Sequence, residues 1–228
     1  MKSASHHAMG HLLHQTLEAS GIRLDKEMFV LGNLLPDYLP ELILSPHFTA
    51  KCQREINVFT GVLAAQHVDR AGEIPAEYAL RLGILCHYIT DYFCFAHNRE
   101  FGKTLSKHAI YELELDGFFR SHYSADECML AEVPFAQCDC AKDVVLDIFQ
   151  TKRRYQSSKR AYQTDVQFAF TTCLNAIRRI LVLSESGQHA FCPVFRFAPF
   201  AAEKYAFQKG VCKRRIVPRR AWCTGPAV

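Results

Sequence analysis

The chain has 228 residues, 49% hydrophobic and 22% charged, which fits one globular domain with a substantial core, with or without a tail, and excludes a disordered protein. The net charge of +4 comes from the end of the chain, where residues 209–228 include six basic residues and no acidic ones. Residues 1–208 hold 21 basic and 23 acidic residues, a net charge of −2. This slightly acidic body argues against a nucleic-acid partner, which would require a basic groove with exposed aromatic side chains.

Helical periodicity predominates along the chain, and no stretch alternates like a strand for long. A first helix is capped by Ser3 or Ser5 and ended by Gly21, and a short second helix is broken by a loop at residues 32–37. The helices predicted in chain order span residues 4–20, 25–31, 51–70, 77–96, 104–122, 139–156 and 164–184. The sequence therefore predicts an all-α fold, a single multi-helix bundle.

Two regions of different composition suggest how the chain is organised. Residues 1–187 are expected to form the helical domain, and residues 188–228 an aromatic and then basic extension that packs only in part. We expect the basic end, which includes Trp222, to be a charged disordered terminus. The alternative is a weak contact with an anionic membrane surface, worth about 1 kcal/mol per charge near the surface.

The start of the chain lacks a sustained apolar stretch and carries four histidines where a signal sequence would be apolar. The longest apolar run, around residues 79–95, is interrupted by charged residues and is expected to be a buried helix rather than a membrane span. We therefore expect a cytoplasmic protein. Its ten cysteines show no framework spacing, so they are expected to be reduced core residues, and the isolated pair Cys138 and Cys140 is a weak metal signal.

Five side chains of kinds that bind metals lie within 26 residues of otherwise apolar, helix-favouring sequence. His87 and Asp91 are four residues apart, as are His108 and Glu112, and His97 lies between the pairs. A spacing of four on a helix places two side chains on one face about 6 Å apart. One such pair alone is typical of a helical hydrogen bond, but buried polar groups in this number require a shared partner, and the run predicts a zinc cluster. His97 lies off the face of Asp91 and is expected to serve a different metal from His87.

The first helix carries four histidines that divide by face. His6 lies on the apolar side and is expected to point into the core, towards the predicted cluster. His7, His11 and His14 form a stripe that we expect to be a solvated face, with adventitious metal binding as the alternative.

Two further candidate ligands, Asp37 and His47, are expected on loops, each directly after a proline. The alternative for Asp37 is a helix cap or turn former.

This ordered set of residues resembles the zinc-dependent phospholipase C family, whose secreted bacterial members share a fold with the single-strand-specific zinc nucleases. The resemblance covers roughly residues 3–120 and rests on Ser5-His6, the run Leu31–Asp37, His47, His87-x3-Asp91-x5-His97 and His108-x3-Glu112. It implies an all-α bundle with a site for three zinc ions. By this resemblance, one zinc is held by Asp37, His47, His87 and Asp91, and a second by His97, His108 and Glu112.

The third zinc would be held by His6 and a bridging Asp91. In the secreted enzymes the N-terminal amine and carbonyl of a processed chain complete that site. Here five residues precede His6, so the amine can reach the site only if the first helix begins late. Two zinc ions are expected, and a third is an open alternative.

The resemblance implies a phosphodiesterase of the phospholipase C type, a zinc-dependent hydrolase that cleaves a phospholipid or similar phosphate ester with a metal-activated water. Asp37 is the expected catalytic residue, because its family counterpart both touches zinc and faces the substrate. Alternatives are a nuclease or phosphomonoesterase using the same metals, and a non-catalytic helical protein that zinc stabilises. Structural zinc sites are closed by four protein ligands, so the three ligands expected around the second zinc favour catalysis unless a cysteine such as Cys94 fills the fourth position.

Overall fold

The computed structural model describes residues 1–38, 49–69, 72–102, 104–123 and 140–186. Within these ranges the regular structure is helical, with one isolated β-bridge between Leu24 and Ile74. The all-α prediction is confirmed. The helices are α1 (Ser3–Ala19), α2 (Lys26–Tyr38), α4 (Thr49–Ala64), α5 (Ala76–Tyr92), α6 (Leu105–His122), α8 (Ala141–Ser157) and α9 (Tyr162–Ser186), with short 3-10 turns η1 (Phe95–His97) and η2 (Arg99–Phe101).

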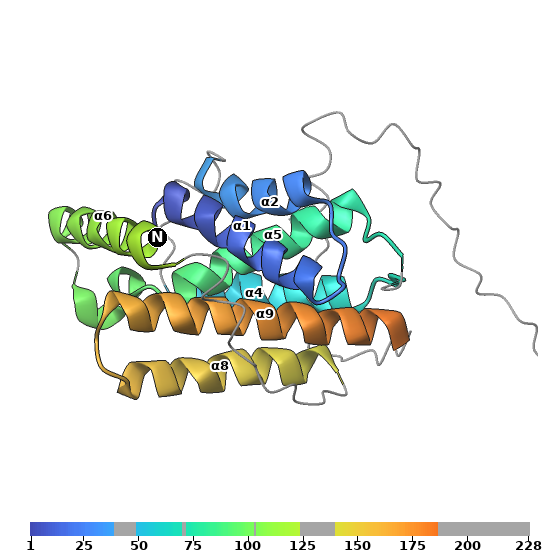
Figure 1. The fold of residues 1–228 in the computed structure, drawn as a ribbon. Helices are drawn as coiled ribbons and strands as arrows, with labels where there is room; N and C mark the ends of the chain where they lie inside the picture. Colours follow the sequence, from blue (N-terminus) through green and yellow to red (C-terminus); the bar gives the residue numbers. More distant parts are fainter. Residues whose placement is uncertain (39–48, 70–71, 103, 124–139, 187–228) are drawn as a thin grey trace, which may run out of the picture. The chain divides into compact units, whose positions relative to one another are not determined.

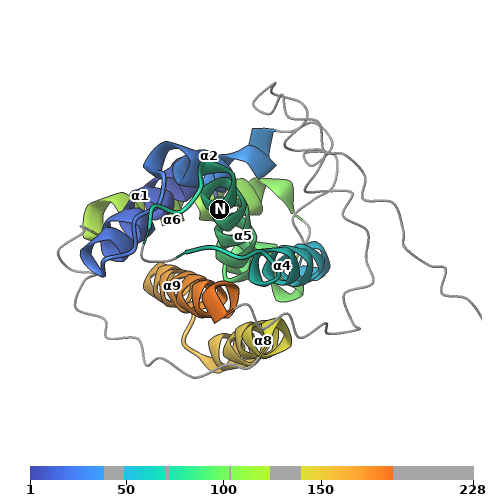
Figure 2. The same ribbon diagram turned by 90° about the vertical axis from the view of Figure 1, so that its right-hand side faces the viewer.

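Helix α5 is the central element of the bundle. It packs against α1, α2, α4 and α9, and every residue from Leu82 to Tyr92 is buried. Helices α1 and α2 lie on one side of α5 and helices α9 and α8 on the other (Figures 1 and 2). A helix enclosed on all sides must be apolar around its whole circumference. The few polar side chains on α5, His87 and Asp91 among them, are therefore held away from bulk water.

Helix α2 corrects the prediction of a loop at residues 32–37, because it runs without a break to Tyr38 and places Asp37 on a helix. Its Gly32 lies against Gly83 of α5 so closely that a Cβ on Gly32 would be 2.1 Å from the Leu80 carbonyl oxygen. Burial of α2 against α5 outweighs the cost of a glycine in a helix, about 1 kcal/mol. The glycine that suggests a break in the sequence is instead a point of close helix packing.

Replacing Gly32 by alanine is expected to lower the free energy of unfolding by about 3 kcal/mol or more, because the α2 and α5 backbones must move apart. Urea unfolding followed by circular dichroism measures the change. Gly117→Ala is the matched control, since it lies within α6 and a Cβ there meets nothing within 4 Å. It is expected to stabilise the protein by up to about 1 kcal/mol. Equal effects of the two substitutions would contradict the close packing of α2 on α5.

The ends of the other helices also differ from the prediction. Lys2, not Ser3 or Ser5, is the N-cap of α1, and the two serine hydroxyls donate to Asp37 and Asp116 instead. Helix α4 ends at Ala64, short of the predicted residue 70. Helix α5 ends at Tyr92, short of residue 96, and the chain continues into η1. The hydrogen bonds of Ser3 and Ser5 reach residues far along the chain, so local sequence gives no sign of them.

The predicted histidine stripe on α1 is only partly solvated. His7 is exposed, with its Nε2 3.2 Å from His11 Nε2. His14 is buried, and its Nε2 lies 3.2 Å from the Leu24 carbonyl oxygen. The prediction of a solvated face is therefore wrong for His14, because the segment after α1 folds back over that side of the helix.

Helix α9 is long and apolar enough to cross a membrane by length and composition alone, and 67% of its most apolar 18-residue window is buried inside the protein. The core helix of a bundle passes the same test. The described cysteines keep their thiols and are not joined in disulfides: Cys52, Cys86, Cys94, Cys140 and Cys173. The extension at residues 188–228, with its basic end, and Cys138 lie outside the described residues.

Candidate metal centre

Three helices bring together a first ligand group, which consists of His6 from α1, Asp37 from α2 and His87 from α5. One ligand atom from each lies within 4.8 Å of the others. The rings of His6 and His87 are stacked with centroids 3.9 Å apart, and both side chains are fully buried. The Asp37 side chain is 19% exposed. The first group is thus enclosed on the histidine side and reached by solvent at Asp37.

The backbone of α2 orients His87 within the first group. His87 Nδ1 lies 2.9 Å from the Asn33 carbonyl oxygen, and since a carbonyl only accepts, Nδ1 carries the proton. The lone pair of Nε2 then faces Asp37 Oδ1 at 3.8 Å and Asp91 Oδ2 at 3.5 Å. Metal-binding histidines are commonly fixed in this way, through the nitrogen that does not bind the metal.

A second ligand group consists of Cys94, which directly precedes η1, His97, which ends η1, and Glu112 from α6. One ligand atom from each again lies within 4.8 Å of the others. Glu112 Oε1 is 2.9 Å from His97 Nε2 and 3.1 Å from His108 Nε2. The rings of His97 and His108 are stacked with centroids 5.0 Å apart. His108 therefore lies beside the second group, on the more exposed side of Glu112.

One buried carboxylate lies between the two groups. Asp91 Oδ2 is 3.5 Å from His87 Nε2 and 3.5 Å from His97 Nδ1, and Asp91 Oδ1 is 3.2 Å from His6 Nε2. The side chain is 1% exposed. Asp91 is thus positioned to bridge two metal ions, one in each group.

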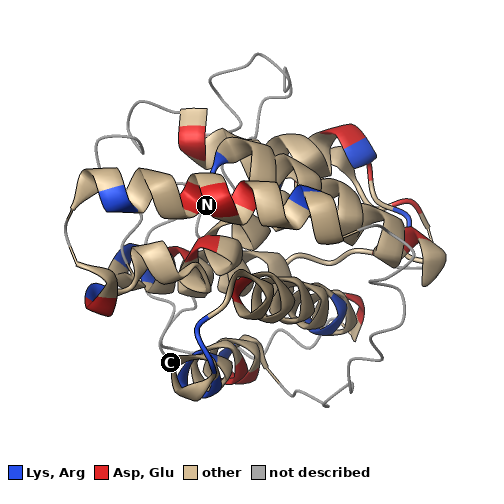
Figure 3. Ribbon diagram, turned by 60° about the vertical axis from the view of Figure 1, so that its left-hand side comes forward, with Lys and Arg blue, Asp and Glu red and all other residues tan. Residues whose placement is uncertain are grey.

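The amino group of Met1 also lies in the centre. It donates a hydrogen bond to Asp91 Oδ1 and is 3.3 Å from Glu112 Oε1 and 3.4 Å from His97 Nε2. Burial lowers the pKa of this amine, but the charges of Asp91 and Glu112 outweigh burial and raise the pKa well above its usual value. Figure 3 shows acidic residues on the ribbon beside the N-terminus. His6, Asp91 and an N-terminal amine, the set that the resemblance implies for a third zinc, thus meet at one carboxylate oxygen.

Burial and neighbouring charges shift the titration of the second group in different directions. Burial lowers the pKa of His97 and raises the pKa of Cys94 to about 12. Burial alone would raise the pKa of Glu112, but hydrogen bonds from His108 and His97 lower it. Without a metal the group is thus set up as a neutral thiol, a neutral imidazole and a carboxylate. A divalent cation would turn the thiol into a thiolate ligand.

The donor atoms fit zinc. Zinc prefers imidazole nitrogen, thiolate sulfur and carboxylate oxygen, and the two groups with Asp91 offer all three kinds. The Nδ1 atoms of His6 and His97 are buried without a hydrogen bond among the described residues, which such atoms rarely tolerate. His97 Nδ1 lies 3.5 Å from Asp91 Oδ2, so a cation bound beside Asp91 would supply the partner that this nitrogen lacks in the described part of the chain.

The structure brings most of the predicted site residues together, but some of them lie in other groups than the resemblance implies. His6 joins Asp37 and His87 as well as facing Asp91. His47 lies outside the described residues. Sequence reasoning expected the N-terminal amine to reach the site only if the first helix began late. That condition is wrong, because α1 begins at Ser3 and the Met1 amine still donates to Asp91. Cys94, which was left open, lies where a fourth ligand of the second zinc was sought. The predicted residues that converge on the centre are His6, Asp37, His87, Asp91, His97, His108 and Glu112.

Comparison with known proteins bears on the same residues. A family model described as zinc-dependent phospholipase C matches residues 3–177. No curated protein and no solved structure matches the chain. The matched region spans both ligand groups and all helices up to most of α9, well over half of the chain, and the chain belongs to the zinc-dependent phospholipase C family.

Proposed function

We propose that the protein is a zinc-dependent hydrolase that cleaves a phosphate diester, with a phospholipid as the first choice of substrate. The observation that carries the proposal is the position of Asp91, which faces both ligand groups with one carboxylate. Pairs of metal ions bridged in this way are typical of enzymes that hydrolyse phosphate esters. The family supports a phospholipase C-like hydrolase in general terms, and the reaction and substrate are our proposal.

When bound, zinc would polarise the phosphoryl oxygens and acidify a water molecule. The residues of the first group would hold one ion between His6, Asp37 and His87, and those of the second group another between Cys94, His97 and Glu112. The ligand carboxylates offset the positive charge of the ions, so the centre remains close to neutral before an anionic substrate binds.

Asp37 is the residue we assign to the attacking water. Its side chain is the most exposed in the first group, at 19%, so a water or substrate molecule can reach it. The Ser3 hydroxyl donates to Asp37 Oδ2 at 2.8 Å, which fixes the plane of the carboxylate and leaves Oδ1 towards His87. Asp37 would then orient the water and accept its proton.

Cys94 favours a second candidate function for part of the centre. With Cys94, the second group together with Asp91 offers four protein ligands, the closed arrangement of structural zinc sites. A non-catalytic protein stabilised by zinc would require the first group to be closed as well. The exposure of Asp37 argues against that for the first group.

The proposal is tested by assaying the zinc-loaded full chain against a choline phosphodiester lipid, a phosphomonoester and single-stranded DNA. We expect hydrolysis of the lipid and its loss after zinc is removed by a chelator. Preferential cleavage of the monoester or of DNA would overturn the substrate assignment. Full zinc content without hydrolysis of any of the three would overturn the catalytic role and leave the structural one.

A further inference from the structure

We propose that Lys152 of α8 and Asp165 of α9 are positioning residues of the metal centre. They hold the segment Tyr92–Asn98, which carries Cys94 and His97, in the geometry that the second ligand group requires. The inference rests on the zinc centre proposed above and extends it to two helices that contribute no ligand.

Asp165 ties together the two elements that supply the second group. Its Oδ2 accepts the Phe95 backbone N–H at 2.8 Å and the Tyr111 hydroxyl at 2.9 Å. Phe95 lies in η1 between Cys94 and His97, and Tyr111 precedes Glu112 on α6. The Tyr155 hydroxyl of α8 donates to Asp165 Oδ1 at 2.7 Å. One carboxylate, 1% exposed, therefore fixes the distance between η1 and α6.

Lys152 holds both ends of the same segment. Its ammonium donates to the Tyr92 carbonyl oxygen and, at 2.7 Å, to Asn98 Oδ1. Tyr92 follows the bridging Asp91, and Asn98 follows His97. The ammonium also lies over the rings of Tyr92 and Tyr155, 4.8 Å and 4.4 Å from the ring centroids, a cation–π arrangement.

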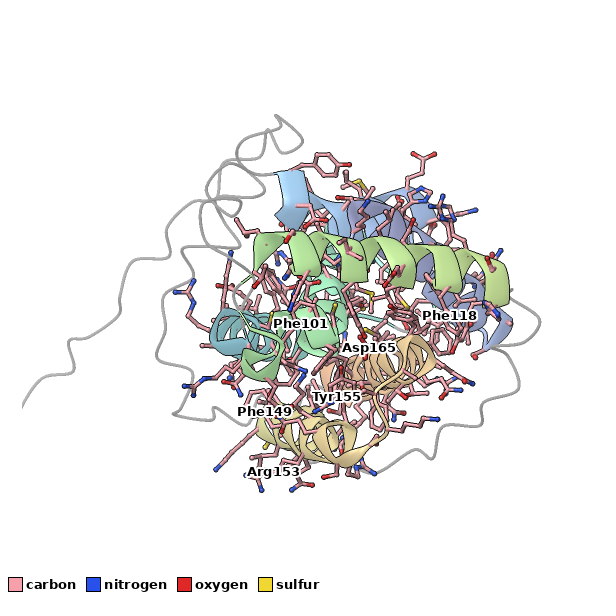
Figure 4. The ribbon with its side chains drawn as sticks, turned by 90° about the vertical axis from the view of Figure 1, so that its left-hand side faces the viewer. Phe101, Phe118, Phe149, Arg153, Tyr155 and Asp165 are labelled. Carbon is pink, nitrogen blue, oxygen red and sulfur yellow. The ribbon has the colours of Figure 1, made fainter. Side chains whose placement is uncertain are left out.

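The segment needs such support because it has left regular helix. After Tyr92 the backbone makes single turns, in which Cys94 N–H donates to the Asp91 carbonyl and His97 N–H to the Cys94 carbonyl. Bonds of this local kind are weaker than a continuous helical ladder. The ammonium at both ends and the carboxylate in the middle compensate. Figure 4 shows Tyr155 and Asp165 inside the bundle, between the helices that they connect.

Two buried charges are costly to keep. Burial lowers the pKa of Lys152 to about 8 and raises the pKa of Asp165. An apolar pair of similar size commonly gives a fold of equal or greater stability. Among the described residues, the side-chain hydrogen bonds of Lys152 and Asp165 all go to the ligand-bearing segment or to a tyrosine beside it. This pattern indicates a role in positioning the ligands.

The test is zinc competition against a chelator in the full chain, with the wild type and the variants Lys152→Met and Asp165→Asn. The wild type should show a second-group step, identified as the step that Glu112→Gln weakens. Lys152→Met and Asp165→Asn are expected to lower zinc affinity in that same step about 10- to 100-fold, as loss of groups that orient ligands does elsewhere, and to leave the first-group step unchanged.

Asp147→Asn is the matched control. Asp147 joins the same two helices through Arg179, with an N–O distance of 3.1 Å, and this ion pair lies away from residues 92–98 in the described part of the chain. It should leave both zinc steps unchanged.

The inference would be overturned if the Lys152→Met and Asp165→Asn variants folded and kept wild-type zinc affinities, or if both zinc steps weakened equally. If neither variant folds, Tyr111→Phe decides: it removes one donor to Asp165, and a second-group step weakened severalfold supports the inference, whereas an unchanged step overturns it. A wild type without bound zinc would instead overturn the proposed function.

Discussion

Replacing Asp91 by asparagine is expected to reduce the zinc content to below one ion per chain and the rate of phosphodiester hydrolysis by about a thousandfold. In the described part of the chain Asp91 is the carboxylate that faces both ligand groups. An amide has neither the charge nor the second anionic oxygen needed to bridge two cations. Loss of roughly 4 kcal/mol of transition-state stabilisation corresponds to that change in rate. Metal analysis after gel filtration and initial rates at saturating substrate measure the two effects.

Asp116→Asn is a suitable control for Asp91→Asn. Asp116 is also a buried carboxylate, 2% exposed, but among the described residues its hydrogen-bond partners are Ser5 and Arg120, and neither of these belongs to a ligand group. It is expected to lower the stability of the protein and retain its zinc. If Asp91→Asn kept two zinc ions and a near-normal rate, Asp91 would not be the bridge.

Replacing Asp37 by asparagine is expected to lower turnover about 100- to 1,000-fold while most of the zinc is retained. The amide keeps one oxygen towards the first group but cannot accept a proton from water, and losses of this size follow removal of one catalytic group. The first-group histidines and Asp91 continue to hold the ion. Turnover and zinc content of the same preparation are the measurements.

Ser3→Ala provides a graded comparison for Asp37→Asn. It removes the hydrogen bond to Asp37 Oδ2, worth about 1 kcal/mol, and should lower turnover about fivefold. Unchanged activity in Asp37→Asn would remove Asp37 from the mechanism. Loss of zinc in proportion to loss of turnover would make it a ligand only.

The metal-binding run on α5 and α6 could be predicted because its signal is local. A spacing of four residues places His87 with Asp91, and His108 with Glu112, whatever the rest of the fold. His97 and His87 belong to different ligand groups, and that they serve different metals stays a prediction. The apolar surroundings of His87 and Asp91 in the sequence correctly indicated burial.

Other features depended on contacts that sequence does not encode locally. From sequence alone Gly32 predicts a break in the helix, because only the fold shows that Gly83 of α5 packs against it. From sequence alone His14 is assigned to an exposed stripe, because only the fold shows that the chain after α1 returns to cover it.

Two contributions to the centre itself were also beyond local sequence. The resemblance pointed to the N-terminal amine, but whether the Met1 amine reaches the centre depends on how α1 packs. Lys152 and Asp165 are ordinary polar residues of two helices until the fold places them against residues 92–98.

The most direct test of the account is the zinc content of the purified full chain, measured by elemental analysis against protein concentration after removal of loosely bound metal. Two ligand groups joined by Asp91 predict at least two zinc ions per chain, and a third where the Met1 amine, His6 and Asp91 also bind one. Fewer than two zinc ions per chain would contradict the metal centre on which the proposed hydrolysis depends.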